Sequence, residues 1–248
     1  MKSIKLPVDE SAQDPLALLN LCDGYYEVSK TPEGKCLSPL VGYAGRYDEG
    51  GQKLQYVGFV YCNFAAAERH TEILEHFSNE IDDALINAGI DTSGATFCGA
   101  PEGGKALALN LAWFNGGQYI YPEKKITALA TANSREESHL VFDRHVPVAG
   151  DEIIIVEDVC NNFSTTADLV RLIESFGARV IAIACFLNRS DKFIDSFEYE
   201  AGSIPVVSLV KKAFGQFRQD DPSVVEDIEA GNVVWKPKND WGKLTAAV

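Results

Sequence analysis

Two neighbouring acids and a run of hydroxyl residues form the part of the sequence with the clearest chemistry. Residues 151–166 read DEIIIVEDVCNNFSTT, in which an apolar run leads to Glu157 and Asp158 and then to the hydroxyl run 164–166. The apolar run predicts a buried strand, and the hydroxyl run predicts the start of a helix. Carboxylates at a strand end can hold a sugar diol or a magnesium ion, and a helix N-terminus favours an anion such as phosphate. The stretch predicts a site for a phosphorylated ribose; the alternative is that Ser164 only caps the helix and the acids are only solvated.

The composition argues against several classes of partner and site. The chain has 248 residues, and its 36 acidic against 22 basic side chains give a formal net charge of −14. Duplex nucleic acid and anionic membranes would be repelled by this charge. No signal-peptide core and no membrane-spanning apolar run is present in the sequence, so we expect a cytoplasmic protein. The six cysteines are scattered without a C-x-x-C pair, which argues against a disulfide scaffold and against a zinc site.

Strands and helices are predicted to alternate along the chain. Strands are expected at residues 24–29, 54–62, 118–121, 153–156 and 179–187, and helices at residues 65–88 and 164–177. Residues 95–114 predict a short strand, a glycine-rich turn and a helix. Because the strands are nearly all apolar, this order predicts an α/β fold with a central, mostly parallel sheet of about five strands flanked by helices. Ligands of such sheets bind at the carboxyl ends of the strands.

Two further segments have their own predictions. The polar segment 123–138 lacks a firm hydrophobic period, and a loop of this length is often a lid or mobile. The tail from Asp220 changes in composition and predicts a helix followed by an extended arm.

Several motifs, in the same order along the chain, resemble those of the type I phosphoribosyltransferases. The stretch IIIVEDVCNNFSTT resembles their signature for 5-phosphoribosyl-1-pyrophosphate (PRPP), in which a strand with two acids precedes a phosphate loop. Within this family, GYYEVSKTPEGKCLSP, GAPEGGKALA and FLNRS are similar to the N-terminal turn, the pyrophosphate loop and a later strand end of the orotate phosphoribosyltransferases. The resemblance covers residues 24–210.

The resemblance implies a domain organisation and a reaction. Residues 1–62 would form a small N-terminal hood with its strands, residues 63–210 a phosphoribosyltransferase-like core, and residues 211–248 a C-terminal helix and arm. The reaction would transfer the 5-phosphoribosyl group from PRPP to a nitrogen of a nucleobase such as orotate, in pyrimidine nucleotide synthesis. Pyrophosphate would be released, with Mg²⁺ bound to it. No covalent nucleophile is needed.

The resemblance also implies a role for each matching residue. Glu157 and Asp158 would contact the ribose hydroxyls, and Asp158 would hold Mg²⁺ by way of water or the ribose. The 5′-phosphate would be bound by Asn161, Asn162, Ser164, Thr165 and Thr166, and the pyrophosphate by Glu102, Gly103, Gly104 and Lys105. Arg189 would hold a carboxylate or carbonyl of the base, because a planar guanidinium suits such groups. Lys30 and Lys35 would neutralise phosphate or base charge, although each is also explained as a solvated surface lysine.

The segment 123–138 has the place of the lid that covers pyrophosphate in the orotate enzymes. Lys124 and Lys125 are the catalytic cations predicted there, together with Asp158, and Arg135 and His139 are further candidates. Lids of this family reach over the active site of a neighbouring subunit, so the resemblance implies a homodimer.

One departure from the family pattern keeps other functions open. Phe163 stands where the family has the first glycine of the phosphate loop, and Asn161 and Asn162 replace two threonines. We expect Phe163 to point away from the phosphate and to pack on apolar side chains. Besides the transferase, two alternatives remain: a non-catalytic PRPP- or nucleotide-binding regulator of the same fold, which Phe163 favours, and an unrelated phosphate-ester binder or hydrolase, which the ordered motifs oppose.

Overall fold

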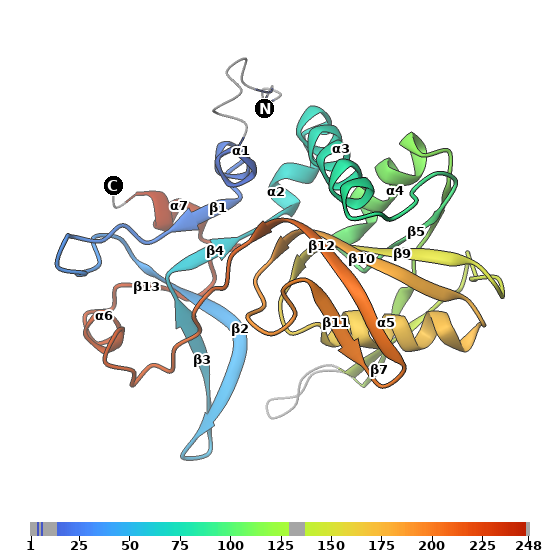
Figure 1. Ribbon diagram of the computed structural model, residues 1–248. Coiled ribbons are helices and arrows are strands. Elements are labelled where there is room, and N and C mark those ends of the chain that lie inside the picture. The colour runs from blue at the N-terminus through green and yellow to red at the C-terminus, as the bar shows by residue number, and fades with distance from the viewer. Residues whose placement is uncertain (1–3, 5, 7–13, 129–136, 247–248) are drawn as a thin grey trace. The chain divides into compact units, whose positions relative to one another are not determined.

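The computed structural model of the protein describes residues 4, 6, 14–128 and 137–246 (Figure 1). The chain forms two compact units, one of Thr71–Ala213 and one that combines Met1–His70 with Phe214–Val248. The expected divisions at residues 62 and 210 therefore lie near the observed ones, but the N-terminal and C-terminal segments belong to one unit instead of two.

The unit Thr71–Ala213 is an α/β structure built around a six-stranded sheet. Its elements, in chain order, are α3 (Thr71–Asn87), β5 (Thr96–Gly99), α4 (Gly104–Phe114), β6 (Gln118–Ile120), β7 (Glu123–Ala128), β8 (Glu137–Val141), β9 (Glu152–Cys160), α5 (Ser164–Ser175), β10 (Arg179–Asn188), β11 (Ser196–Tyr199) and β12 (Gly202–Lys211). The sheet has the order β11-β12-β10-β9-β5-β6. All pairs from β12 to β6 are parallel, and the edge strand β11 is antiparallel. The predicted fold class, a central and mostly parallel sheet flanked by helices, is confirmed.

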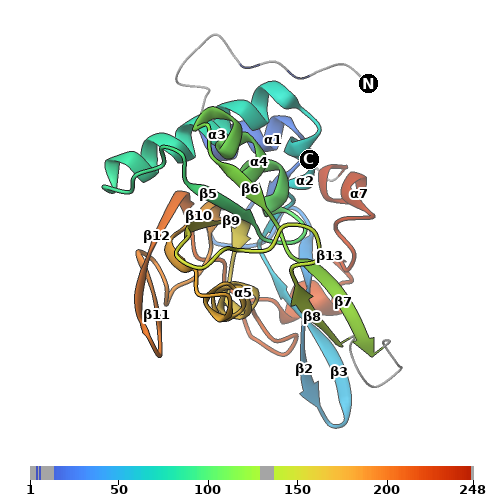
Figure 2. The ribbon, with the colours of Figure 1, turned by 90° about the vertical axis from the view of Figure 1, so that its right-hand side faces the viewer.

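Helices cover both faces of this sheet, with α5 on one face and α3 and α4 on the other (Figure 2). Side chains alternate between the faces along each strand, so the continuous apolar run of β9 supplies both layers. Ile153 and Ile155 share a core with Leu169 and Ile173 of α5. On the opposite face, the fully buried rings of Phe77 in α3 and Phe186 in β10 lie with their centroids 4.6 Å apart.

The register of the sheet brings two loops to one edge. Gly99, the last residue of β5, pairs with Val156 of β9, and Glu157 pairs with Cys185 of β10. The chain therefore leaves β5 and β9 at the same carboxyl edge of the sheet. The glycine-rich turn after β5 and the turn before α5 both start from this edge, as the sequence predicts for a ligand site.

The unit formed by the two chain ends has its own small sheets. Its elements are α1 (Pro15–Leu21), β1 (Tyr25–Glu27), β2 (Leu40–Glu49), β3 (Gln52–Gly58), β4 (Val60–Cys62), α2 (Ala65–Glu68), α6 (Val225–Glu229), β13 (Val233–Val234) and α7 (Trp241–Thr245). β1 pairs with β4, and β13, β2 and β3 form a second sheet. Leu40 and Val57 share a core with Val234 and Leu244 of the tail. The tail is thus part of this unit's core, because it completes both a sheet and a hydrophobic cluster.

The prediction of a single strand at residues 54–62 is wrong, because the structure has two strands there, β3 and β4, which belong to different sheets. β3 ends at Gly58 and β4 begins at Val60. A Cβ on Gly58 would lie 2.3 Å from the hydroxyl oxygen of Tyr43, whose O–H donates to the carbonyl of Val60 at 2.7 Å. The ring of Tyr43 therefore occupies the point where the strand breaks, and this contact between distant residues leaves no mark in the hydrophobic pattern.

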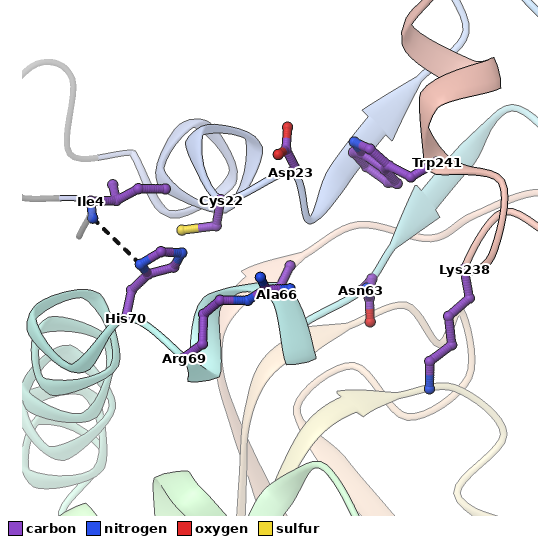
Figure 3. A pocket seen from close by; sticks show the side chains of 9 residues that line it. All are labelled: Ile4, Cys22, Asp23, Asn63, Ala66, Arg69, His70, Lys238 and Trp241. Atoms are coloured by element: carbon purple, nitrogen blue, oxygen red, sulfur yellow. Dashed lines mark hydrogen bonds between the residues drawn. The ribbon is translucent and has the colours of Figure 1, made fainter. Parts of the chain in front are cut away.

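The predicted helix 65–88 is also two elements, α2 and α3. The N–H of His70 donates to the carbonyl of Ala67, only three residues back, at 2.8 Å. The side chain of His70 is buried, and its Nδ1 accepts from the N–H of Ile4 at 3.4 Å. The chain thus breaks between α2 and α3 at His70, which makes a tertiary contact (Figure 3), although the apolar residues of the two helices follow one continuous period.

The segment 123–138 is not wholly a structureless loop, because its first residues form β7, which pairs antiparallel with β8 at Glu137–Val141. Residues 129–136, which include Arg135, lie outside the described residues. The two strands pair through their backbone groups. Their mixed Lys, Thr, Ala and Glu composition lacks the hydrophobic alternation from which a strand is predicted.

Two further expectations can be compared with the structure. All six cysteines are free thiols, with Cys36 and Cys62 half-buried and the other four buried, as expected for a chain without a disulfide scaffold. Among the described residues, every helix is too short or too polar to cross a bilayer.

The aromatic contact under α3 predicts a large loss of stability on truncation. Phe77→Ala removes a fully buried ring, so the free energy of unfolding should fall by about 3–5 kcal/mol. Ile86→Ala on the exposed side of the same helix should change it by about 0.5 kcal/mol or less, since Ile86 is 54% exposed. Urea denaturation followed by circular dichroism measures both. Equal losses for the two variants would contradict the assigned packing of α3.

Candidate functional site

The two neighbouring acids lie within β9 rather than beyond its end. β9 continues to Cys160, so Glu157 and Asp158 are strand residues, with Glu157 9% exposed and Asp158 half-buried. The prediction that the strand ends before the acids is wrong, since β9 keeps its pairing with β10 up to Asn188. The acids are not simply solvated.

Burial sets the protonation of this pair. Desolvation, and after it the charge of Asp158, raises the pKa of Glu157 to about 8, against the opposing effect of the Lys124 charge. Desolvation also raises the pKa of Asp158, whereas the hydrogen bond with the Glu157 side chain lowers it. Burial therefore favours the protonated form of Glu157 at neutral pH, and a charge on either carboxyl group opposes ionisation of the other. Such a pair can donate from one carboxyl group and accept at the other.

The glycine-rich turn after β5 packs directly on the Asp158 carboxylate. A Cβ on Gly103 would lie 2.2 Å from Cγ of Asp158, and a Cβ on Gly104 would lie 2.0 Å from the carbonyl oxygen of Val156. The N–H of Ala100 donates to the same carbonyl at 2.9 Å. Gly103 has φ −72°, which other residues adopt readily, so space and not backbone conformation requires glycine here. The turn and the acid thus form one surface.

The remaining predicted residues of this turn surround the start of α4. Lys105 Nζ lies 2.8 Å from Oε2 of the exposed Glu102 and 4.8 Å from the centroid of the Tyr121 ring. The lysine is partly neutralised by Glu102 and held over the ring, where a cation is attracted by the ring face. Tyr121 was missed by sequence reasoning. Its only signal is its place, just after β6 at the same edge of the sheet.

The turn before α5 keeps some of its donors occupied. The side-chain Oδ1 of Asn162 accepts from the N–H of Ser164 at 3.2 Å and from its hydroxyl at 3.0 Å. Phe163, and not Ser164, has the N-cap position, so the alternative that Ser164 caps the helix does not describe this turn. The N–H groups of Thr165 and Thr166 are first-turn donors that an α-helix leaves without an acceptor of its own. They remain available to an acceptor outside the helix, and Asn161 is exposed beside them.

Phe163 packs on apolar side chains, as predicted. It is 3% exposed, its ring stacks on Phe197 at a centroid distance of 5.5 Å, and Phe193 lies edge-on at 5.2 Å. Its backbone has φ +56°, in the left-handed region that bulky residues rarely adopt. The aromatic cluster therefore holds a turn that glycine would form without strain. Phe193 and Phe197 lie far along the sequence, and no local pattern pointed to them.

The structure brings one of the two hairpin lysines to the acids. Lys124 is close enough to Glu157 for its charge to lower that pKa. Lys125 instead pairs with Asp143, at 3.4 Å between Nζ and Oδ2, and stands opposite His139 in the hairpin.

The remaining predicted residues lie at the strand end and in the other unit. Arg189 follows β10, and its N–H donates to the carbonyl of Cys160 at 2.9 Å, which ties it to the end of β9. Lys30 and Lys35 belong to the unit of the chain ends, where Lys30 Nζ lies 3.3 Å from the centroid of the Phe59 ring and Lys35 is exposed in a turn.

The donor set around Asp158 limits how a metal ion can bind. Across the described part of the chain, no group of three or more His, Cys, Asp or Glu side chains is arranged to hold a metal ion. Asp158 offers one charged carboxylate. This fits an ion such as Mg²⁺, which commonly uses one or two carboxylates, water and the phosphate oxygens of a ligand.

The chain resembles known proteins in sequence and in fold. No protein-family model matches the chain. Orotate phosphoribosyltransferase of Caldanaerobacter subterraneus subsp. tengcongensis is 23% identical over 161 residues, which cover 65% of this chain and 74% of that protein. The structure of Leishmania donovani UMP synthase aligns with a TM-score of 0.52 at 12% identity, over 95% of this chain and 42% of that one. Orotate phosphoribosyltransferase from Aeropyrum pernix aligns with a TM-score of 0.46 at 16% identity, over 68% of this chain and 87% of that one. By sequence the chain is thus similar to an orotate phosphoribosyltransferase, and by fold to a UMP synthase, both at low identity.

Proposed function

We propose that this protein is a phosphoribosyltransferase of the orotate type, which transfers the 5-phosphoribosyl group of PRPP to a base such as orotate. The observation that carries the proposal is the contact of the Gly103 turn with the Asp158 carboxylate. The Asp158 carboxylate, the backbone of the Gly103 turn and the first N–H groups of α5 thus lie along one edge of the sheet. A ribose that carries phosphate groups at both ends has the matching chemistry.

Each part of the site has a defined task in this proposal. Asp158 accepts from the ribose hydroxyls, and the raised pKa of Glu157 limits the negative charge that the pair presents to the phosphates. The N–H groups of Thr165 and Thr166 bind the 5′-phosphate, because they lie at the positive end of the helix dipole. The turn that contains Gly103 and Lys105 receives the pyrophosphate. Lys124 adds a cation where charge develops on the leaving group, which lowers the barrier by electrostatic stabilisation.

Magnesium and a second subunit complete the proposal. Asp158 would hold Mg²⁺ through water or the ribose, and the ion would neutralise charge on the pyrophosphate. A homodimer, in which the β7–β8 hairpin of one subunit serves its neighbour, rests on the family resemblance together with the exposed lysines of β7.

A non-catalytic regulator that binds PRPP or a nucleotide is the second candidate. The N–H and the hydroxyl of Ser164 both donate to Asn162 Oδ1. The turn therefore has fewer donors left for a phosphate. Phe163 also fixes the turn by packing into the core. Both observations suggest that PRPP binds weakly at this turn, which favours a regulator over an efficient enzyme. An activity assay separates the two candidates.

Asp158→Asn tests the transferase proposal most directly. The substitution keeps the shape of the side chain and removes its charge, so pyrophosphate release from PRPP, orotate and magnesium should fall by at least about a hundredfold. Asp168→Asn on the exposed side of α5 is the control, because its ion pair with Arg171 is solvated and should contribute little. Full activity of Asp158→Asn would refute the assigned role. No release by the native protein, with PRPP binding intact in calorimetry, would favour the regulator.

The packing of Phe163 predicts opposite effects on binding and stability. Phe163→Gly removes a ring whose burial contributes about 1.5–3 kcal/mol, partly offset because glycine adopts φ +56° without strain. The melting temperature should fall, while PRPP affinity measured by calorimetry with magnesium should rise as the turn gains freedom to fit the phosphate. Phe193→Leu is the control, since it thins the same cluster but leaves the turn unchanged. An equal gain in affinity for both variants would contradict the explanation.

The raised pKa of Glu157 predicts a stability difference with a defined sign. Because the folded-state pKa is about 8 and the ordinary value is 4.5, the folded state holds an extra proton between these limits. The contribution of Glu157 to the free energy of unfolding should therefore fall as pH rises from about 4.5 to about 8. Glu157→Gln cannot ionise, so its stability relative to the native protein should rise across that window. Denaturation at several pH values measures this, and a difference independent of pH would contradict the assigned burial.

A further inference from the structure

The cation of the glycine-rich turn is held by two contacts of different kinds. Lys105 lies in the first turn of α4, and its Nζ is 2.8 Å from Oε2 of Glu102 and 4.8 Å from the centroid of the Tyr121 ring. The side chain of Lys105 is 25% exposed, whereas that of Glu102 is 76% exposed. Most of the lysine surface is thus covered, while its carboxylate partner stays in contact with solvent.

The Tyr121 ring is itself held beside the turn. Its centroid lies 5.4 Å from that of Tyr119 and 5.9 Å from that of His145, which meets it edge-on. Tyr121 precedes the buried Pro122, and a residue before proline is restricted to extended backbone conformations. Because β6 pairs in parallel with β5, Tyr121 leaves the sheet at the same edge as the turn that follows β5. Neighbouring rings and a restricted backbone therefore fix this ring next to Lys105.

The two contacts of Lys105 respond differently to a bound anion. The Glu102 carboxylate has the same sign of charge as a phosphate group, so the two compete for one ammonium group. An exposed ion pair of this kind is weak, and an anion with more charge displaces it. The Tyr121 ring is neutral, and its electron-rich face attracts the ammonium group whether or not an anion is bound. Tyr121 is therefore the contact that can hold Lys105 in both the free and the bound protein.

We propose that Tyr121 is a positioning residue, which holds the ammonium group of Lys105 where the turn receives the pyrophosphate, and that Glu102 pairs with this ammonium group until the pyrophosphate replaces it. The inference rests on the transferase function proposed above. A side chain that is already held loses less conformational entropy on binding, which raises affinity. The two contacts thus have opposite effects: the ring strengthens pyrophosphate binding, and the Glu102 carboxylate weakens it. The resemblance implied that Glu102 binds the pyrophosphate, whereas here it competes with it.

The position of the ammonium group can be measured without any ligand. In nuclear magnetic resonance spectra of protein with isotope-labelled lysine, the ring current of Tyr121 should shift the Cε proton resonance of Lys105 upfield. Lys105→Arg assigns this resonance by its loss. Tyr121→Leu should return it to the range of solvated lysines, whereas Tyr121→Phe keeps a ring and should retain the shift. An unshifted resonance in the native protein, or an unchanged one in Tyr121→Leu, would show that the ring does not hold the lysine.

Calorimetry with pyrophosphate and magnesium measures the consequence for binding. Tyr121→Leu should weaken the affinity about tenfold, as the loss of a cation–ring contact at a partly covered site predicts, and Tyr121→Phe should bind like the native protein. Glu102→Gln should bind more tightly than the native protein, most clearly at low ionic strength. Asp240→Asn is the matched control, because Asp240 pairs with Lys243 at the same spacing, 2.9 Å apart, in the unit of the chain ends. It removes the same charge and should leave the affinity unchanged.

A double variant separates positioning from a general effect on the fold. In Lys105→Met, which lacks the ammonium group, Tyr121→Leu should cause no further loss of affinity, because a positioning residue acts only through the lysine. An equal loss in this background would mean that Tyr121 supports the site in general, and it would overturn the proposal.

Other outcomes separate this inference from the function on which it rests. If the native protein binds pyrophosphate, but Tyr121→Leu binds it equally well or Glu102→Gln binds it more weakly, only the inference fails. If the native protein binds no pyrophosphate in the presence of magnesium, the transferase proposal fails, and this inference fails with it.

Discussion

The lack of space between the glycine-rich turn and β9 is the constraint on which the candidate site depends. At Gly103 and Gly104 even a methyl group would overlap the Asp158 carboxylate or the backbone of β9. The backbone of the turn therefore lies in direct contact with β9. Because α4 begins at Gly104, the start of that helix also lies against the strand. A single larger residue at either position would separate the turn from the acid and move Lys105 away from the same surface.

This close contact also explains the electrostatics of the site. Because the turn and the sheet shield Glu157 and Asp158 from water, burial raises the pKa of both carboxyl groups and favours the protonated form of Glu157 at neutral pH. Lys124 on the neighbouring hairpin partly compensates the remaining charge. In a protein with a net charge of −14, the proposed binding of an anionic ligand at this edge depends on these local cations and backbone N–H groups.

The turn before α5 is stabilised differently from the glycine-rich turn. Here an aromatic residue adopts a left-handed conformation, and the stack of Phe163 on Phe197 supplies the burial that offsets the strain. The turn is thereby part of the hydrophobic core under α5. Its shape is set by packing, and its polar groups are partly used within the turn by Asn162. The proposed phosphate binding at this position therefore depends on the helix N–H groups more than on side chains.

The sequence by itself determined the features that local chemistry encodes. The apolar run of β9, the glycine-rich turn before α4 and the amphipathic helix α5 are each visible within a few residues, so the parallel sheet followed from strand order, whereas a shared site for Asp158 and Gly103 was implied by the family resemblance. Tertiary structure decided what depends on distant partners. Tyr43 broke the strand 54–62, the tail joined the unit of the chain ends, and Phe197 held Phe163 in place. The protonation of Glu157 was likewise decided by the fold, because a pKa depends on burial and neighbouring charges that no spacing along the chain records.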